Sequence, residues 1–428
     1  MTNQELMQED LKHIFHPCSQ MKDHEKLPLI PIKKGKGSYI YDYDGNEYLD
    51  CISSWWVNIF GHSNAYINTK INEQLQELEH VIFAGFTHKP AVDLAKRLIA
   101  LTPEPLQKIF FADNGSSAIE ISLKMSFQYF KNKGQSRPLF VSLENSYHGE
   151  TLGALAVSDT GLYKDIYTDI LIKTIQAKSP SLVDEDEAIE DMRRVLTQHK
   201  NEVCSVVIEP LIQCAGSMKM YDASYIKKLR TLCDEFGVFL IADEIAVGFG
   251  RTGTLFAIEQ AEISPDFLCL SKGITGGYMP LSVVLFTDDI YNAFYCDYNE
   301  GKSFLDSHSY TGNTLACSVA NAVLDIFEKD NILENNQKKI TFIKEQTQKF
   351  KTLSCVAEVR QRGMVCAIEL QGFDTTRRVG LEIFQKALKE GVYIRPLGNI
   401  IYFMPPYVFT DAQLKKMIDV TYGIVKSL

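Results

Sequence analysis

Residues 238–253, VFLIADEIAVGFGRTG, combine a short apolar run, a carboxylate at its end and a glycine-rich remainder. Val238–Asp243 is typical of a buried strand, because it is apolar at nearly every position rather than at alternate ones. Residues 248–253 match the pattern G-x-G-x-x-G. In a dinucleotide-binding fold the first glycine follows the strand almost directly and the third lies in a helix. Here four residues separate Asp243 from Gly248, which disfavours an NAD-dependent dehydrogenase.

Short apolar runs of the same kind recur through the middle of the chain, with helical patterns between several of them. Strands that alternate with helices and are apolar throughout predict a mainly parallel sheet that is covered on both faces. About seven such strands predict one large α/β domain. The apolar runs are 108–113, 139–143, 171–177, 203–210, 238–243, 267–272 and 282–287, and the helical patterns include 115–131, 185–199 and 222–236.

The two ends of the chain show a different pattern. Residues 38–52 alternate apolar and polar side chains around Asp44-Gly45, which predicts a β-hairpin. Beyond residue 311, a helical stretch leads to strand-like runs and a closing helix near 410–427, a pattern that predicts a smaller α+β domain. We expect three parts: residues 1–60 with the hairpin, joined in space to the smaller domain; residues 61–315, the large domain; and residues 316–428, the rest of the smaller domain.

Composition narrows the classes of function. The chain has 428 residues, of which 45% are hydrophobic and 23% charged, enough for a large core and two domains. A net charge of −10 argues against a nucleic-acid surface. The polar N-terminus and the absence of a long apolar run predict no signal peptide and no membrane association. Ten scattered cysteines fit a reducing, cytoplasmic location. His13 and His16 lack a second ligand cluster, so we expect no metal site.

The first candidate for a ligand site follows the strand-like run that ends at Asp113, because ligands of such sheets bind beyond the carboxyl ends of the strands. Gly115 and Ser116 stand there at the start of a helix, where free amides and the helix dipole suit a phosphate group. An ordinary helix cap would use the same residues, and Ser117 and Glu120 have the spacing of a capping box.

Other strand ends carry an aromatic ring, carboxylates and an amine. Tyr147 lies beside a glycine after the second run and is suited to stack on a planar ligand. Glu209 and Asp243 each end a strand. Lys272 closes an apolar run, so we expect its amine to be partly desolvated, which lowers its pKa and makes it a better nucleophile. The alternative is a lysine at a strand end that reaches solvent.

One cofactor requires all of these features together, namely pyridoxal 5′-phosphate (PLP). It needs a lysine for its Schiff base and a carboxylate that keeps its ring nitrogen protonated. It also needs an aromatic partner for the ring and an anion site for the phosphate. Because Asp243 and Lys272 end two successive strands, the sequence predicts a PLP-dependent enzyme.

Longer segments identify a family. The run from Asp243 to Gly253, Ser271-Lys272-Gly273 and Asn145–Gly149 resemble the class III (ω-type) aminotransferases of PLP fold type I, over nearly the whole chain. The resemblance implies this fold, PLP as cofactor and a homodimer with shared active sites. Four further segments resemble the branch that transfers an amino group to 8-amino-7-oxononanoate in biotin biosynthesis. They are HPCSQM (16–21), SSWW (53–56), HVIFAGFTH (80–88) and IRPLG (394–398).

The resemblance also implies roles for single residues. Lys272 binds PLP and carries a proton, Asp243 pairs with the ring nitrogen, and Tyr147 lies beside the ring and the substrate. Further cofactor contacts are implied for Gly115, Ser116, Glu209, His308 and Ser309, the last two reaching the partner's phosphate site. Substrate contacts are implied for Cys18, Trp55, Tyr147, Lys272, Ser307, Arg395 and Tyr402.

Two of the implied substrate residues have structural alternatives. Arg395 matches the arginine that binds the substrate carboxylate, a task that suits a bidentate guanidinium; its alternative is a surface ion pair. We assign Trp55 mainly to the site and its neighbour Trp56 mainly to the core.

The amino donor is open. In familiar members that use S-adenosylmethionine, an aromatic residue that meets the adenine often follows His-Pro, whereas here Cys18 follows Pro17. Some relatives use lysine, and residues 307–313 resemble theirs. The Trp55-Trp56 pair resembles the adenosylmethionine users, which we favour.

Two alternatives to this function remain. One is another ω-aminotransferase, acting on ornithine, acetylornithine, γ-aminobutyrate or a polyamine, and the other is a binding protein without activity. The latter is disfavoured because the lysine, the carboxylate and the phosphate site are all present.

Overall fold

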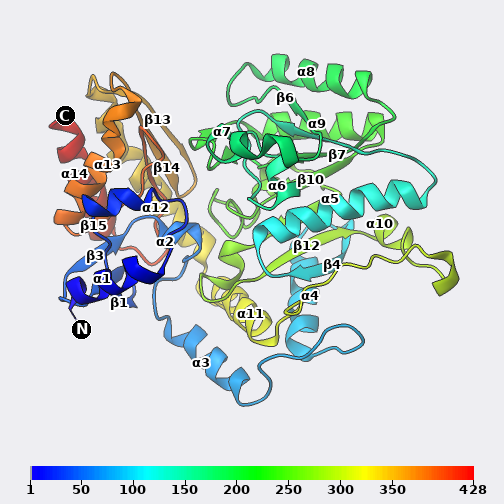
Figure 1. Cartoon of the computed structure of the whole chain (residues 1–428), viewed down its shortest axis with the longest axis horizontal. Coiled ribbons are helices and arrows are strands. Elements are labelled where there is room, and N and C mark those ends of the chain that lie inside the picture. The colour runs from blue at the N-terminus through cyan, green and yellow to red at the C-terminus, as the bar shows by residue number, and fades with distance from the viewer. Residues whose placement is uncertain (1) are drawn as a thin grey trace.

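A seven-stranded sheet runs through the larger of two lobes, on the right in Figure 1. The computed structural model describes residues 2–428. The strands are β4 (Leu106–Ala112), β5 (Leu139–Leu143), β6 (Ile175–Ala177), β7 (Val203–Ile208), β10 (Phe239–Asp243), β11 (Phe267–Leu270) and β12 (Ser282–Thr287). Their order is β4-β12-β11-β10-β7-β5-β6, and all neighbours are parallel except β12, which is antiparallel to β4 and β11. The predicted mainly parallel sheet is confirmed, although only the last three residues of run 171–177 form a strand.

Helices cover both faces of this sheet. Successive residues of β10 enter different cores, since Leu240 and Ala242 belong to the larger core and Ile241 to the smaller one. Helices α5 (Gly115–Asn132) and α6 (Leu152–Ala156) pack into the smaller core, whereas α8 (Glu185–Gln198) and α9 (Ala223–Phe236) pack into the larger one. Burial on both faces explains why these strands are apolar at consecutive positions.

The smaller lobe contains both ends of the chain, drawn in blue, orange and red on the left of Figure 1. The predicted hairpin is confirmed as β2 (Tyr39–Asp42) and β3 (Glu47–Asp50). Strand β3 pairs in parallel with β15 (Val392–Tyr393), so segments from opposite ends of the chain share a sheet. The other elements of this lobe are α1 (Asn3–His13), η1 (Met21–Glu25), β1 (Ile32–Lys36), α12 (Ile332–Thr347), η6 (Gln348–Thr352), β13 (Val356–Arg362), β14 (Val365–Leu370), η7 (Thr375–Arg377), α13 (Val379–Lys389), β16 (Ile400–Phe403) and α14 (Asp411–Lys426), where η denotes a 3-10 helix.

The remaining elements connect the lobes or flank the large sheet. Helix α11 packs on α3 and α4 at the lower edge of Figure 1. No helix within residues 2–428 is both long and apolar enough to cross a membrane. The elements are α2 (Ser53–Trp56), α3 (Ala65–Leu75), α4 (Lys89–Leu101), α7 (Gly161–Lys164), η2 (Asp165–Ile170), β8 (Ile212–Gln213), β9 (Lys219–Met220), η3 (Ala257–Ala261), η4 (Lys272–Thr275), α10 (Asp288–Asn292), η5 (Tyr298–Glu300) and α11 (Thr314–Lys329).

The glycine-rich residues 248–253 form a turn rather than the start of a helix. Gly250 and Gly253 have φ values of 91° and 106°, a backbone region that favours glycine. Arg251, which lies between them, is 1% exposed and donates to the carbonyl oxygens of Pro405 at 2.8 Å and Trp56 at 3.2 Å. Residues 248–253 therefore connect β10 to the smaller lobe through Arg251, and they lack the helix that a dinucleotide site requires.

Candidate active site

A cavity of about 410 Å³ lies at the carboxyl ends of β4, β5, β7, β10 and β11. Parallel strands end at one edge of a sheet, so residues far apart in the sequence meet there. Six of the residues that the sequence singled out line this cavity: Gly115, Ser116, Tyr147, Glu209, Asp243 and Lys272.

Asp243 is held in place from two sides at the floor of the site. Its Oδ2 accepts a hydrogen bond from His148 Nδ1 at 2.7 Å, and its Oδ1 accepts one from the amide of Ile245 at 3.1 Å. Asp243 is 4% exposed and His148 is 2% exposed. His148 Nε2 is buried and has no hydrogen-bond partner within residues 2–428. The pair therefore presents a fixed carboxylate to the cavity.

Lys272 brings an amine to the same cavity. Burial is the largest influence on its pKa and lowers it, while the negative charge of Asp243 opposes this effect. Its Nζ lies 5.0 Å from the centre of the Trp56 ring. Its φ is 45°, a left-handed value that is costly for a side chain of this kind and that is typical of functional sites. The desolvated amine is a nucleophile at lower pH than an ordinary lysine.

The start of α5 provides an anion site. Asn114 caps this helix, because its Oδ1 accepts the amide of Ser117 at 3.1 Å. The capping box that the sequence suggested for Ser117 and Glu120 is wrong, since the helix begins earlier and Glu120 instead accepts the amide of Gly153. A Cβ at Gly115 would lie 2.8 Å from Ile245 Cγ2. The glycine thus keeps room where the amides and the dipole of an 18-residue helix face the cavity.

Glu209 supports the wall of the cavity from within. Its carboxylate accepts the amides of Tyr147 at 2.9 Å and Cys214 at 3.0 Å. Burial raises the pKa of Glu209 to about 7, and the nearby His148 opposes that shift. The side chain fixes the backbone of Tyr147, whose hydroxyl donates to Glu150 Oε1 at 2.9 Å.

Arg395 packs against Trp55, and neither of them lines the cavity, although the neighbouring Trp56 does. Its guanidinium is 4.7 Å from the centre of the Trp55 ring, and its Nη2 donates to the Cys18 carbonyl oxygen at 3.5 Å. Within residues 2–428, Arg395 makes no ion pair with a carboxylate, so the ion-pair alternative finds no partner. Trp55 is 37% exposed, and Cys18 is exposed with a φ of 48°. A partly stacked cation without an acidic partner is available to an anionic ligand.

Trp56 is part of the core and of the cavity wall. It is 4% exposed, yet it lines the cavity. Its Nε1 donates to the Tyr402 hydroxyl at 3.0 Å, and the two rings meet edge to face. Tyr402 is 1% exposed and does not line the cavity; it contacts Trp56, which does. The assignment of Trp56 mainly to the core therefore describes only part of its position.

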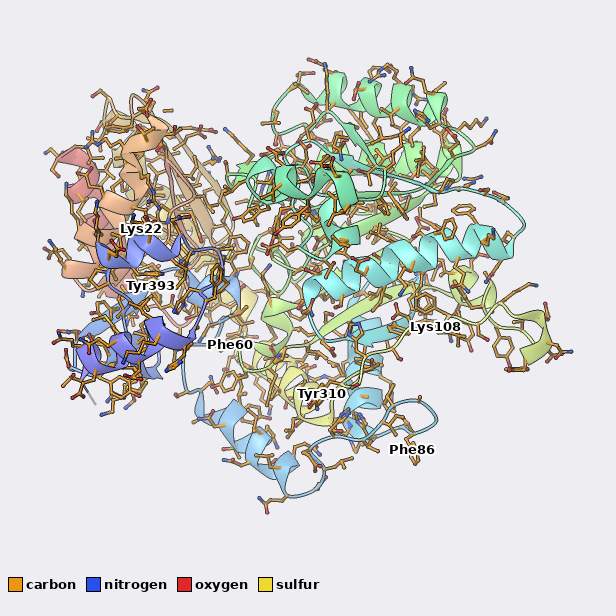
Figure 2. All side chains as sticks on the ribbon, viewed as in Figure 1. Lys22, Phe60, Phe86, Lys108, Tyr310 and Tyr393 are labelled. Atoms are coloured by element: carbon orange, nitrogen blue, oxygen red, sulfur yellow. The ribbon has the colours of Figure 1, made fainter. Side chains whose placement is uncertain are left out.

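Residues 307–309 lie outside this chain's cavity lining. His308 Nδ1 is 2.8 Å from Asp113 Oδ2, whereas Ser307 and Ser309 are exposed. A second contact holds this segment, because His80 Nε2 lies 2.8 Å from the Ser309 carbonyl oxygen. Figure 2 labels Tyr310 and Phe86 in these two neighbouring segments, at the lower edge of the larger lobe.

Among the residues that were not singled out from the sequence, His148, Ile245 and Glu150 contact the predicted residues Asp243 and Tyr147. His148 directly follows Tyr147 and Ile245 stands two residues after Asp243, so proximity in the sequence was the available signal. Within the described residues, no group of three or more histidine, cysteine, aspartate or glutamate side chains is arranged to hold a metal ion.

Known proteins are similar to this chain in sequence and in fold over nearly its whole length. A protein of Helicobacter pylori named adenosylmethionine-8-amino-7-oxononanoate aminotransferase is 51% identical over 426 residues, 98% of this chain and 96% of that protein. The protein of the same name from Geobacter sulfurreducens is 40% identical over 98% of this chain and 96% of its own length.

Solved structures of aminotransferases have the same fold as this chain. The crystal structure of the enzyme of that name from Methanocaldococcus jannaschii superposes with a TM-score of 0.96 at 37% identity, covering 99% of both chains. A PLP-bound amine transaminase from an uncultivated Pseudomonas species superposes with a TM-score of 0.92 at 29% identity, covering 97% of this chain and 98% of that one. The sequence pattern described as Aminotransferase class-III matches residues 20–425. A match of this extent shows that the chain belongs to the class-III aminotransferase family.

Proposed function

We propose that this protein is a PLP-dependent aminotransferase of biotin biosynthesis. It transfers the amino group of S-adenosylmethionine to 8-amino-7-oxononanoate and produces 7,8-diaminononanoate. The observation that carries the proposal is the cavity in which a desolvated lysine, a buried carboxylate and an open helix N-terminus converge. The names of the relatives from Helicobacter pylori and Geobacter sulfurreducens support the pair of substrates.

The residues present fit PLP. The N-terminus of α5 at Gly115 and Ser116 suits the phosphate, and the close approach of Gly115 to Ile245 leaves no room for a larger residue. Asp243, fixed by His148, suits a protonated ring nitrogen. Tyr147 suits a ring face and Lys272 the covalent link. When bound, PLP supplies a carbon that accepts an amino group and a ring that withdraws electrons from it.

The chain itself supplies binding and proton transfer. Burial lowers the pKa of Lys272, which favours an amine that can accept the proton from the donor carbon that carries the amino group. The same amine would deliver it to the cofactor carbon on the other side of that nitrogen. Arg395 binds the carboxylate of the donor, since its guanidinium makes no ion pair with the described residues. Trp55 and Cys18 border that position. Tyr402 supports the wall through its hydrogen bond with Trp56.

A homodimer completes the site in this proposal. His308 and Ser309 would reach the phosphate site of the partner protomer, and Ser307 would lie near its substrate. Large apolar side chains are exposed on the same protomer, including Leu162 at 84% and Ile166 at 84%, and exposed apolar groups of this kind mark interaction surfaces. Sedimentation equilibrium should give twice the mass of the chain.

We also propose the three-part division of the chain into residues 1–60, 61–315 and 316–428. The pairing of β3 with β15 supports the union of the first and third parts. Helix α11 packs on α3 and α4 of the large part, so it crosses the boundary that this division places after residue 315. The cysteines are all free, which supports a reducing, cytoplasmic location.

The visible spectrum tests the function and the donor. The purified protein, supplied with PLP, should show the absorption band of lysine-bound PLP, and S-adenosylmethionine should bleach it. Bleaching by lysine alone would transfer the donor role to lysine. No band after addition of PLP would overturn the proposal.

A further inference from the structure

Helix α2 has an unusual backbone. Ser53, Ser54, Trp55 and Trp56 all have positive φ values, of 52°, 45°, 74° and 76°. A left-handed helical backbone is unfavourable for every residue with a side chain, and none of the four is glycine. Such a run persists only where its surroundings determine it. The contacts that hold it therefore matter for whatever its side chains do.

Asp50 is the centre of these contacts. It is fully buried, and its Oδ1 accepts the amides of Ser54 at 3.0 Å and Ile52 at 3.3 Å. Its Oδ2 accepts the Ser54 hydroxyl at 2.7 Å and lies 3.0 Å from His62 Nε2. His62 Nδ1 lies 3.1 Å from the Asn58 amide nitrogen, so Nδ1 accepts and Nε2 carries the proton. One carboxylate thus binds four donors around the start of the turn.

The turn directs two aromatic rings to the two basic side chains, Arg395 and Lys272. The Trp55 ring faces the guanidinium of Arg395 at 4.7 Å, and the Trp56 ring faces Lys272 Nζ at 5.0 Å. In a right-handed turn, consecutive side chains would leave the backbone in other directions. Asp50 is not among the residues that line the cavity, so it acts through the turn.

We propose that Asp50 is a positioning residue: its carboxylate holds the left-handed turn Ser53–Trp56, which places Trp55 against Arg395 and Trp56 against Lys272. The kinetic consequence rests on the proposed aminotransferase function, whereas the structural consequence does not. In Asp50→Asn, the side-chain amide has one acceptor oxygen where the carboxylate has two. Its NH₂ group must therefore face a donor, which is either His62 Nε2–H or the backbone amides of Ser54 and Ile52.

Tryptophan fluorescence measures the structural consequence directly, because Trp55 and Trp56 are the only two tryptophans of the chain. The full-length protein and its variants are compared as purified, with matched PLP content. We expect Asp50→Asn to shift the emission maximum to longer wavelength and to raise quenching by acrylamide. Ser54→Ala, which removes only the hydroxyl bond to Asp50, should produce a smaller change in the same direction.

Asp42→Asn is the matched control. Asp42 is likewise a buried aspartate of the smaller lobe, 3% exposed, and accepts the Asn46 amide at 2.8 Å and the Tyr48 hydroxyl at 3.0 Å. Its loss should lower thermal stability but leave the emission and the quenching of the folded protein unchanged. An equal fluorescence change in Asp42→Asn would overturn the proposal, because the turn would then respond to any loss of stability.

Kinetics measure the second consequence. We expect kcat/KM for S-adenosylmethionine to fall roughly 10- to 100-fold in Asp50→Asn, the cost of small misplacements in a catalytic site, and to stay within twofold in Asp42→Asn. Parent-like fluorescence and kcat/KM in Asp50→Asn would refute the positioning role. If Asp50→Asn does not fold, the Ser54→Ala variant tests the proposal instead. Acrylamide quenching equal to that of the parent in Ser54→Ala would then refute the positioning role of Asp50. A parent protein without aminotransferase activity would overturn the proposed function, while the fluorescence comparison would still test the turn.

Discussion

His148 Nδ1 lies 2.7 Å from Asp243 Oδ2, and both side chains are buried where β5 and β10 lead into the cavity. A buried carboxylate needs a partner, because an uncompensated charge in such a place costs several kcal/mol. The imidazole supplies that partner and, together with the amide of Ile245, fixes the orientation of the carboxylate that lines the cavity.

Replacement of His148 tests this pair. In His148→Phe the ring volume is kept and the hydrogen bond to Asp243 is lost, so we expect kcat to fall by about 10- to 100-fold and PLP to bind more weakly, in line with ~1.5–3 kcal/mol for a hydrogen bond to a charged group. PLP affinity is read from the visible band during titration. The exposed His13 provides the control His13→Phe, which should match the parent. A parent-like affinity and kcat in His148→Phe would show that Asp243 needs no partner.

Replacement of Arg395 tests substrate binding. Its guanidinium packs on Trp55, donates to the Cys18 carbonyl oxygen and makes no ion pair with a carboxylate within residues 2–428. We expect Arg395→Ala to raise KM for the donor roughly 10- to 100-fold, the value of a charge-assisted hydrogen bond. Arg395→Lys should recover only part of this loss, because an ammonium cannot bind both carboxylate oxygens in a plane. An unchanged KM in Arg395→Ala would remove Arg395 from the substrate site.

The buried Glu209 predicts a pH dependence of stability. Burial raises the pKa of its carboxyl from 4.5 to about 7 in the folded chain, so the folded state binds the proton more tightly than the unfolded state. This contribution is fully present below pH 4.5 and is lost as pH rises through 7. The raised pKa of Glu209 contributes at most about 3 kcal/mol to the free energy of unfolding.

The variant Glu209→Gln isolates this effect, since the amide does not titrate. Thermal unfolding should show that the melting temperature of the parent, measured relative to Glu209→Gln, falls between pH 5 and pH 8. The exposed Glu235, which pairs with Arg193, offers the control Glu235→Gln, for which the difference should not depend on pH in this range, because an arginine stays charged throughout it. A parent that gains stability relative to Glu209→Gln on going to pH 8 would contradict the raised pKa.

The sheet was predictable from the sequence because β5, β7, β10, β11 and β12 are buried on both faces and are therefore apolar at most consecutive positions. Strand β6 is shorter than its apolar run, since residues before Ile175 lie outside the sheet. The strand-end rule brought Asp243 and Lys272 to one cavity. It gives the end of a strand but not the direction of a side chain in the loop that follows.

Side-chain directions in loops explain what the sequence missed. His148 reaches Asp243 because the loop turns at Asn145, which has a φ of 62°. The position of Trp56 in the cavity wall depends on the left-handed turn at α2. A run such as Ser53–Trp56 gives no local signal for that backbone, because four residues with side chains disfavour it. Asp50, which holds the turn, therefore had no signature of its own.

The most direct test of the central claim follows the amino group itself. The protein is supplied with PLP, 8-amino-7-oxononanoate and S-adenosylmethionine that carries ¹⁵N in its α-amino group, and the product is analysed by mass spectrometry. We expect 7,8-diaminononanoate with one ¹⁵N atom from the parent chain and no product from Lys272→Ala. Product formation by Lys272→Ala, or no labelled product from the parent chain, would contradict the account.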